Sequence, residues 1–133
     1  MLGLSKPKTK TKRARILVVD DQREMIEIIR HRLGSSGWEI LTAGDGQEGL
    51  EKAIEEKPDL ILLDTMMPVM DGHQMLAQLR KTPETKDIPV IMCTGCSEAD
   101  DIVKASSYNV SDYITKPFNL TELGTRIKQV LDD

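Results

Sequence analysis

The chain is 133 residues long, which suits one domain with a well-buried core and is too short for two domains of ordinary size. Hydrophobic residues make up 39% and charged residues 30%, a composition typical of globular proteins, and no apolar run approaches the roughly 20 residues that span a bilayer. The net charge of −4 argues against a nucleic-acid-binding domain, because such binding rests on Lys and Arg side chains that neutralise phosphates.

Residues 1–13 form a basic tail, which we expect to be disordered and distinct from a domain over residues 14–133. Lysine and threonine alternate along much of this tail, and such a pattern buries nothing. An alternative is that the tail touches an anionic partner. The tail lacks the apolar core of a secretory signal, so we expect a cytoplasmic protein without membrane contact.

Apolar runs of strand length alternate with amphipathic stretches of helical period, which is typical of βαβ units and a mostly parallel sheet. Strands are predicted near residues 15–20, 38–43, 59–64, 89–94 and 110–115. Helices are predicted over residues 22–35, 46–57, 71–81, 97–107 and 119–131. The last helix should begin at Asn119 as its cap, with Glu122 three residues later. The sequence therefore predicts five repeats of strand followed by helix.

Polar side chains stand at or just after the ends of four predicted strands: Asp20, Asp21, Asp64, Thr94 and Lys116. Open α/β sheets bind ligands at the carboxyl ends of their strands, so these residues predict one pocket. Three neighbouring carboxylates repel one another unless a cation neutralises them, and hard oxygen ligands suit Mg²⁺. As alternatives, Asp20 and Asp21 could cap the following helix, and the other three could be ordinary turn or solvated residues.

Several motifs occur in a fixed order along these strand ends. They are the Asp20-Asp21 pair, Asp64, Met67-Pro68, Met70-Asp71-Gly72, Thr94 and the run from Tyr113 to Phe118. Together they resemble the receiver domain of two-component response regulators, of the kind found in chemotaxis regulators, over about residues 14 to 132. The resemblance implies a flavodoxin-like, doubly wound α/β fold with a five-stranded parallel sheet of order 2-1-3-4-5 and five helices.

The resemblance also implies a role for each pocket residue. Asp64 would be the phospho-acceptor, since a carboxylate that attacks phosphorus forms an acyl phosphate. Mg²⁺ would be held by Asp21 directly, by Asp20 directly or through water, by one oxygen of Asp64 and by the backbone carbonyl of Met66. Lys116 and Thr94 complete the expected catalytic set.

Lys116 would pair with Asp64 or the phosphoryl group, and Thr94 would donate its hydroxyl to a phosphoryl oxygen. Thr94 and Tyr113 are the expected switch pair, with Tyr113 turning inward as Thr94 moves. The surface formed by residues 97–107, 110–115 and 119–131 would then change shape. The resemblance also implies a cis Lys116-Pro117 bond. The alternative for Tyr113 is an edge aromatic residue that does not switch.

The expected partners are a histidine kinase or phosphotransfer protein and a downstream protein that reads the changed surface. We expect a monomer or a weak, phosphorylation-dependent dimer that modifies itself and turns over no separate substrate. A haloacid-dehalogenase-type hydrolase is disfavoured, because that family places a second Asp where this chain has Met66. Two alternatives stay open: a receiver fragment of a longer regulator with a DNA-binding or enzymatic domain, and a binding module that never accepts phosphate.

The chain departs from the common pattern of the family in three places, one of which is the presence of Ser106, Ser107 and Ser111 at positions that are more usually apolar or alanine. Asn109 stands where a glycine usually ends the fourth helix, and Asn tolerates the left-handed conformation better than most residues. Cys93 and Cys96 have a spacing similar to a redox motif. We expect reduced thiols instead, with Cys93 as a small buried apolar residue.

Overall fold

Five short parallel strands form the single sheet of the computed structural model, which describes residues 13–95 and 108–132. The strands are β1 (Arg15–Val19), β2 (Glu39–Ala43), β3 (Leu60–Asp64), β4 (Val90–Thr94) and β5 (Asp112–Thr115). Their order in the sheet is β2-β1-β3-β4-β5, which confirms the predicted topology. Strand β5 begins two residues later than predicted, after Asn109 has taken up a left-handed conformation with φ of 59°.

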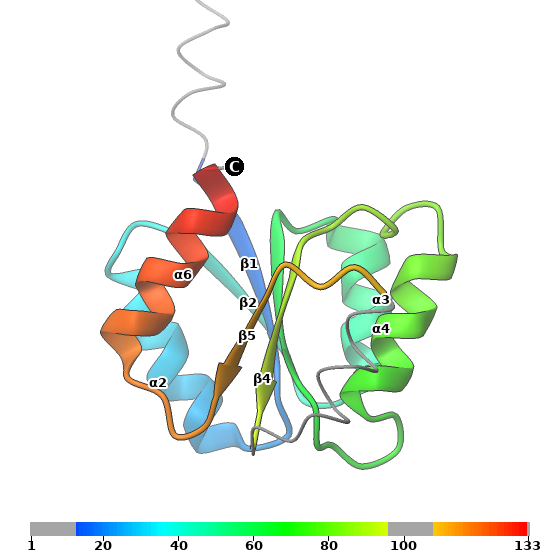
Figure 1. Cartoon of the computed structure of the whole chain (residues 1–133), viewed down its shortest axis with the longest axis horizontal. Coiled ribbons are helices and arrows are strands. Elements are labelled where there is room, and N and C mark those ends of the chain that lie inside the picture. The colour runs from blue at the N-terminus through cyan, green and yellow to red at the C-terminus, as the bar shows by residue number, and fades with distance from the viewer. Residues whose placement is uncertain (1–12, 96–107, 133) are drawn as a thin grey trace, which may run out of the picture.

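Helices cover both faces of this sheet (Figure 1). They are α2 (Arg23–Gly34), α3 (Gly46–Glu56), α4 (Gly72–Lys81) and α6 (Leu120–Asp132). Helices α2 and α6 lie on one face, and α3 and α4 lie on the other. Four of the five predicted helices are thereby confirmed. The predicted helix over residues 97–107 and almost all of the basic tail lie outside the described residues.

The alternation of side chains along each strand divides the core between the two faces. Ile16 and Val18 pack toward α2 and α6, whereas Leu17 and Val19 pack toward α3 and α4. All five residues of β3 are buried, as expected for a central strand covered on both faces. The polar residue that ends β3 is therefore held on the most enclosed strand of the sheet.

Side-chain caps define the starts of three helices. Asp45 accepts a hydrogen bond from the Glu48 amide at 2.8 Å, and Asp71 forms a reciprocal capping box with Gln74. The predicted cap of α6 is confirmed, because the Asn119 side chain accepts from the Glu122 amide at 2.8 Å. No helix within residues 13–95 and 108–132 has the length and apolar character needed to cross a membrane.

Candidate functional site

Parallel pairing brings four strand ends to one edge of the sheet. Asp20 follows β1, Asp64 ends β3, Thr94 ends β4, and Lys116 follows the last residue of β5. In the register of the sheet Asp64 lies opposite Cys93, and Thr94 lies opposite Thr115. The strands therefore deliver the predicted residues to a common edge, as the sequence pattern indicated.

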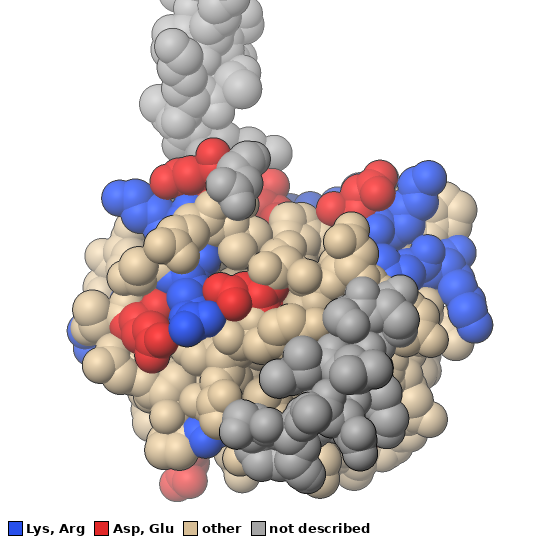
Figure 2. Space-filling view, in the orientation of Figure 1, with Lys and Arg blue, Asp and Glu red and all other residues tan. Residues whose placement is uncertain are grey.

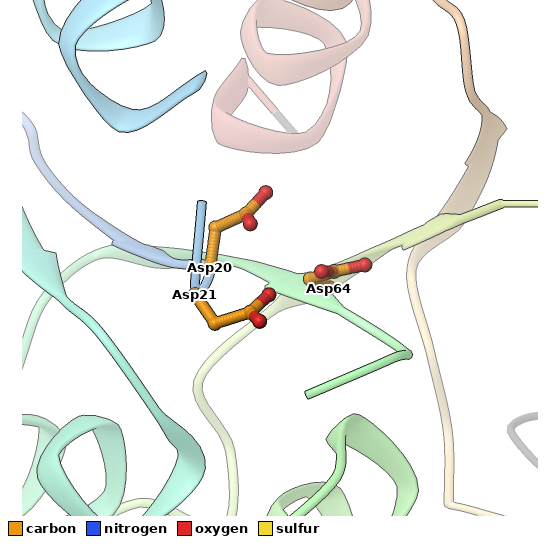
Figure 3. A group of neighbouring side chains, drawn as sticks. All are labelled: Asp20, Asp21 and Asp64. Atoms are coloured by element: carbon orange, nitrogen blue, oxygen red, sulfur yellow. The ribbon is translucent and has the colours of Figure 1, made fainter. Parts of the chain in front are cut away.

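Three carboxylates form an acidic cluster at this edge. Oxygen atoms of Asp20, Asp21 and Asp64 all lie within 4.8 Å of one another, a grouping that could hold a metal ion (Figure 3). Asp20 and Asp64 are almost fully buried, with 3% and 5% of their surfaces exposed, whereas Asp21 is exposed. An exposed carboxylate beside two buried ones gives a cation an open side from which to enter.

Asp20 and Asp21 do not cap helix α2 with their side chains. The N-cap of α2 is Gln22, which makes no side-chain capping bond. Asp20 instead accepts a hydrogen bond from the Gln22 amide at 2.9 Å through its Oδ1 atom. The other Asp20 oxygen is thus directed to the acidic cluster and its neighbours.

The ammonium group of Lys116 lies between the two buried carboxylates. Its Nζ is 3.1 Å from Oδ2 of Asp20, to which it donates a hydrogen bond, and 3.3 Å from Oδ1 of Asp64. The pairing with Asp64 confirms the prediction, while the contact with Asp20 was not predicted. The Lys116-Pro117 peptide bond is cis.

Burial and charge perturb the proton affinities of this group. Burial raises the pKa of Asp64, the charge of Asp20 raises it further, and Lys116 partly offsets both effects. Burial opposes the charged form of Lys116, but Asp64 and Asp20 outweigh this effect and raise the pKa of the ammonium overall. The surroundings of Asp64 therefore disfavour the charged form of its carboxyl group.

The expected switch residues lie on the two neighbouring strands. Thr94 is buried with 3% of its surface exposed, and its carbonyl accepts a hydrogen bond from the Lys116 amide at 2.7 Å. Tyr113 is half-buried on β5 and packs against the core cluster on the side of α3 and α4. Burial also raises the pKa of its phenol. Movement of Thr94 and Tyr113 stays a prediction.

Met66 lies in the loop that follows β3. Its side chain is 72% exposed, so the thioether is not needed for packing at this position. The Met66 amide donates a long hydrogen bond of 3.4 Å to Oδ1 of Asp64, which places the backbone beside the acidic cluster. The predicted role of the Met66 carbonyl as a metal ligand stays a prediction.

Gly72 lets helix α4 begin against the backbone at the end of β3. A Cβ atom at this position would lie 2.2 Å from the Asp64 carbonyl oxygen and 2.8 Å from the Thr65 Cα. The Gly72 amide donates to the Thr65 carbonyl at 3.1 Å. The Asp-Gly pair at the start of a predicted helix was the sequence signal for this turn, but the close approach depends on the fold.

Thr65 is a buried polar residue that the sequence reasoning did not single out. Its surface is 4% exposed, and its hydroxyl oxygen has no hydrogen-bond partner among residues 13–95 and 108–132. A single threonine after an apolar run carries no pattern that would reveal this environment. Thr65 is therefore a buried hydroxyl residue, next to Asp64 in the chain, to which no role is assigned.

Comparison with known proteins agrees with this geometry. The family model described as "Response regulator receiver domain" matches residues 16–128. The chain belongs to the response regulator receiver domain family. The strand order and the acidic cluster at the sheet edge are those expected from the resemblance in the sequence.

Two curated relatives illustrate the match to this receiver domain family. The alkaline phosphatase synthesis transcriptional regulatory protein PhoP of Bacillus subtilis is 41% identical over 117 residues, which cover 88% of this chain and 48% of that protein. The DNA-binding dual master transcriptional regulator RpaA of Synechocystis is 35% identical, with the same two coverages. The chain spans about half the length of the curated relatives it matches.

Solved structures show the same fold. The chemotaxis protein CheY4 of Vibrio cholerae matches with a TM-score of 0.85 and 30% identity, covering 90% of this chain and 99% of that one. A CheY-like receiver domain protein of Methanospirillum hungatei matches with a TM-score of 0.86 and 31% identity, covering 91% and 95%. The fold is therefore shared with these two solved structures over at least 90% of this chain.

Proposed function

We propose that this receiver domain is a phosphorylation-controlled switch that accepts a phosphoryl group on Asp64 in a reaction that requires Mg²⁺. The observation that carries the proposal is the position of Lys116 Nζ, 3.1 Å from Asp20 and 3.3 Å from Asp64, beside a third, exposed carboxylate. A buried nucleophilic carboxylate with a fixed cation and an open acidic side suits phosphoryl transfer, which depends on positioning and charge neutralisation.

The residues present fit a divalent cation. Mg²⁺ would be held by Asp20, Asp21, Asp64 and the Met66 carbonyl, which supply hard oxygen ligands. Oxygen atoms of the three carboxylates lie within 4.8 Å of one another. When bound, the ion neutralises the cluster and the negative charge that develops on the transferred phosphoryl group. The raised pKa of Asp64, caused first by burial and then by the charge of Asp20, supports this expectation, because a bound cation would favour the charged carboxylate.

The protein's own side chains orient the transfer. An oxygen of Asp64 forms the new bond to phosphorus as the bond between phosphorus and the donor histidine nitrogen breaks. Lys116 provides a fixed positive charge for the phosphoryl oxygens, and Thr94 supplies a hydroxyl donor from the end of β4. Because the product stays on the chain, the domain modifies itself and is not an enzyme with a separate substrate.

The signal would pass to a protein partner through the surface that includes β5 and α6. On the described part of this surface, acidic and basic side chains lie side by side (Figure 2). They include Arg126, which pairs with Asp112 at 2.9 Å and with Glu122 at 3.0 Å. A mixed polar surface of this kind suits a partner recognised by complementary charges and argues for a monomer or a weak dimer.

The expected donor is a histidine kinase or phosphotransfer protein in the cytoplasm. The relatives PhoP and RpaA are named as transcriptional regulators, and the matched region is about half of each. A DNA-binding output attached to this domain is therefore a second candidate for how the signal is used. Within residues 13–95 and 108–132, no basic surface helix suits DNA binding, so such an output would lie in another domain.

Intact-mass analysis after incubation with a small acyl phosphate tests the proposal. With Mg²⁺ we expect one phosphoryl adduct, which is lost without Mg²⁺ and in Asp64→Asn. Asp59→Asn is a matched control, because Asp59 is an exposed aspartate at the opposite end of β3 and should leave the adduct unchanged. A folded wild-type protein without an adduct would support the alternative of a phosphate-independent binding module.

A further inference from the structure

Arg80, in the last turn of α4, connects two segments that are far apart in the chain. Its guanidinium donates to the Tyr108 carbonyl at 2.7 Å and to the Asn109 carbonyl at 3.3 Å. The same group donates to three carbonyls of the loop before β4, those of Lys86 and Ile88 at 3.0 Å and of Thr85 at 3.4 Å. One side chain thus joins the approach to β4 to the approach to β5.

These contacts hold the guanidinium with backbone dipoles instead of a carboxylate. Among the described residues no acidic side chain forms an ion pair with Arg80. Burial lowers the pKa of Arg80, and the charge of Asp87 only partly offsets this effect. A rigid fork of donors suits several carbonyls at once, whereas a lysine ammonium would present one compact charge to the same set.

Asn109 forms the turn that leads into β5, on the side of the Arg80 contacts opposite the loop before β4. Its φ of 59° lies in the left-handed region, where the chain turns sharply before it enters β5. The turn leaves the carbonyls of Tyr108 and Asn109 within reach of the same guanidinium. The amide of Ser111 then donates to Val90 at 2.9 Å, and regular pairing begins with Asp112 opposite Ile91.

Arg80 contacts the segments that precede β4 and β5, and both strands lead to the residues expected to respond to phosphorylation. Strand β4 ends at Thr94, and β5 carries Tyr113 and leads into Lys116. Because a strand is stiff along its length, the point at which β5 is fixed beside β4 sets where Tyr113 and Lys116 lie relative to Thr94. The acceptor Asp64 is on β3, and the hydrogen bonds of Arg80 to the described residues go to residues 85–88 and 108–109, outside that strand.

We propose that Arg80 is a positioning residue of the switch, which fixes β4 and β5 relative to each other and so couples the state of the Asp64 site to Tyr113. This inference rests on the proposed function. Loss of the hydrogen bonds made by the Arg80 guanidinium allows β5 to adopt more than one position beside β4. Asp64 then still accepts a phosphoryl group, but Tyr113 responds less to it.

Tyrosine NMR offers a direct test, because the chain contains only two tyrosines. Tyr108 reports on the Arg80 contacts, and Tyr113 reports on the switch. The full chain with fluorinated tyrosine would be measured with and without Mg²⁺ and beryllium fluoride, a phosphoryl analogue. In Arg80→Lys we expect a shifted Tyr108 signal and a Tyr113 response to the analogue at least twofold smaller than in the wild type. Arg30→Lys, on the exposed face of α2, is the matched control and should respond like the wild type.

Asn109 variants test the same coupling from the other side if Arg80→Lys fails to fold. Asn109→Ala disfavours the left-handed turn and should reduce the Tyr113 response, whereas Asn109→Gly keeps the turn and should preserve it. A full Tyr113 response in Arg80→Lys and Asn109→Ala, with only a lower melting temperature, would overturn the inference. Asp64 adducts measured by mass on the same samples separate this outcome from failure of the proposed function, in which even the wild type forms no adduct.

Discussion

Asp64 illustrates how the placement of a single residue in the site carries a cost to stability. Its carboxylate is buried next to Asp20, and one ammonium, that of Lys116, compensates both. A carboxylate in this position lowers the stability of the folded state, because burial and a like charge disfavour its ionised form. Such conflicts between stability and placement are typical of functional sites.

Replacement of Asp64 by Asn should therefore stabilise the metal-free protein. The folded pKa of Asp64 lies above its ordinary value of 3.8, so the wild type loses stability as the pH rises from 3.8 through the folded pKa. Asp64→Asn lacks this loss, and its melting temperature at pH 7 should be several degrees higher in EDTA. Thermal unfolding across pH 3 to 8 checks this, and the difference should vanish below pH 3.8. A variant less stable than the wild type at pH 7 would contradict the electrostatic account.

Cys93 shows the opposite situation, in which burial makes a reactive group inert. Burial raises the pKa of its thiol to about 12, and the residue packs in the core on the side of α2 and α6. In a Cys96→Ser background, we expect no alkylation of native protein at pH 8 and complete alkylation in denaturant. Mass spectrometry gives the count directly, and stoichiometric labelling of native protein would show that the thiol is accessible.

At the scale of elements, Gly72 determines how closely α4 approaches β3. Alanine at this position would place a Cβ atom 2.2 Å from the Asp64 carbonyl, so the helix start must move. We expect Gly72→Ala to cost about 2–3 kcal/mol of unfolding free energy, as overpacking does, and to lower the rate of Asp64 phosphorylation.

Gly124 provides the matched control for Gly72. It lies within α6, and a Cβ atom there would meet nothing within 4 Å. Alanine should stabilise the protein by about 0.5–1 kcal/mol through helix propensity alone. Urea unfolding of both variants tests the pair, and equal effects at the two positions would remove the close approach as the explanation.

The elements were largely predictable from sequence, because apolar runs and turn residues act locally. The run before Asp64 and the cap at Asn119 each specify their own segment, and both were placed within a residue or two. Contacts such as Arg80 to Tyr108 or Lys116 to Asp20 were not predictable from residue patterns. They join positions 28 and 96 residues apart, and nothing in the local sequence marks the partner.

At the scale of the whole molecule, cation binding and folding should be linked. A ligand that binds the folded state alone stabilises it by about 2.7 kcal/mol when its concentration is one hundred times its dissociation constant. We therefore expect Mg²⁺ to raise the melting temperature of the wild type. Asp21→Asn should weaken this effect with little change in EDTA, since Asp21 is exposed. Calorimetric scans with and without Mg²⁺ provide the measurement, and a variant as responsive as the wild type would remove Asp21 from the ligand set.

The sheet also has a functional direction. On one side of β3, strands β4 and β5 end in Thr94 and Thr115, and β5 leads into Lys116. On the other side, the outer strand β2 ends in Ala43, which is followed by Gly44. A charge added at Asp64 therefore has polar side chains near it at the ends of β4 and β5. The end of β2, the opposite edge strand, has no such side chain. The end of β2 supports the site through its backbone instead, because the Ala43 carbonyl accepts a hydrogen bond from the Asp20 amide at 3.1 Å.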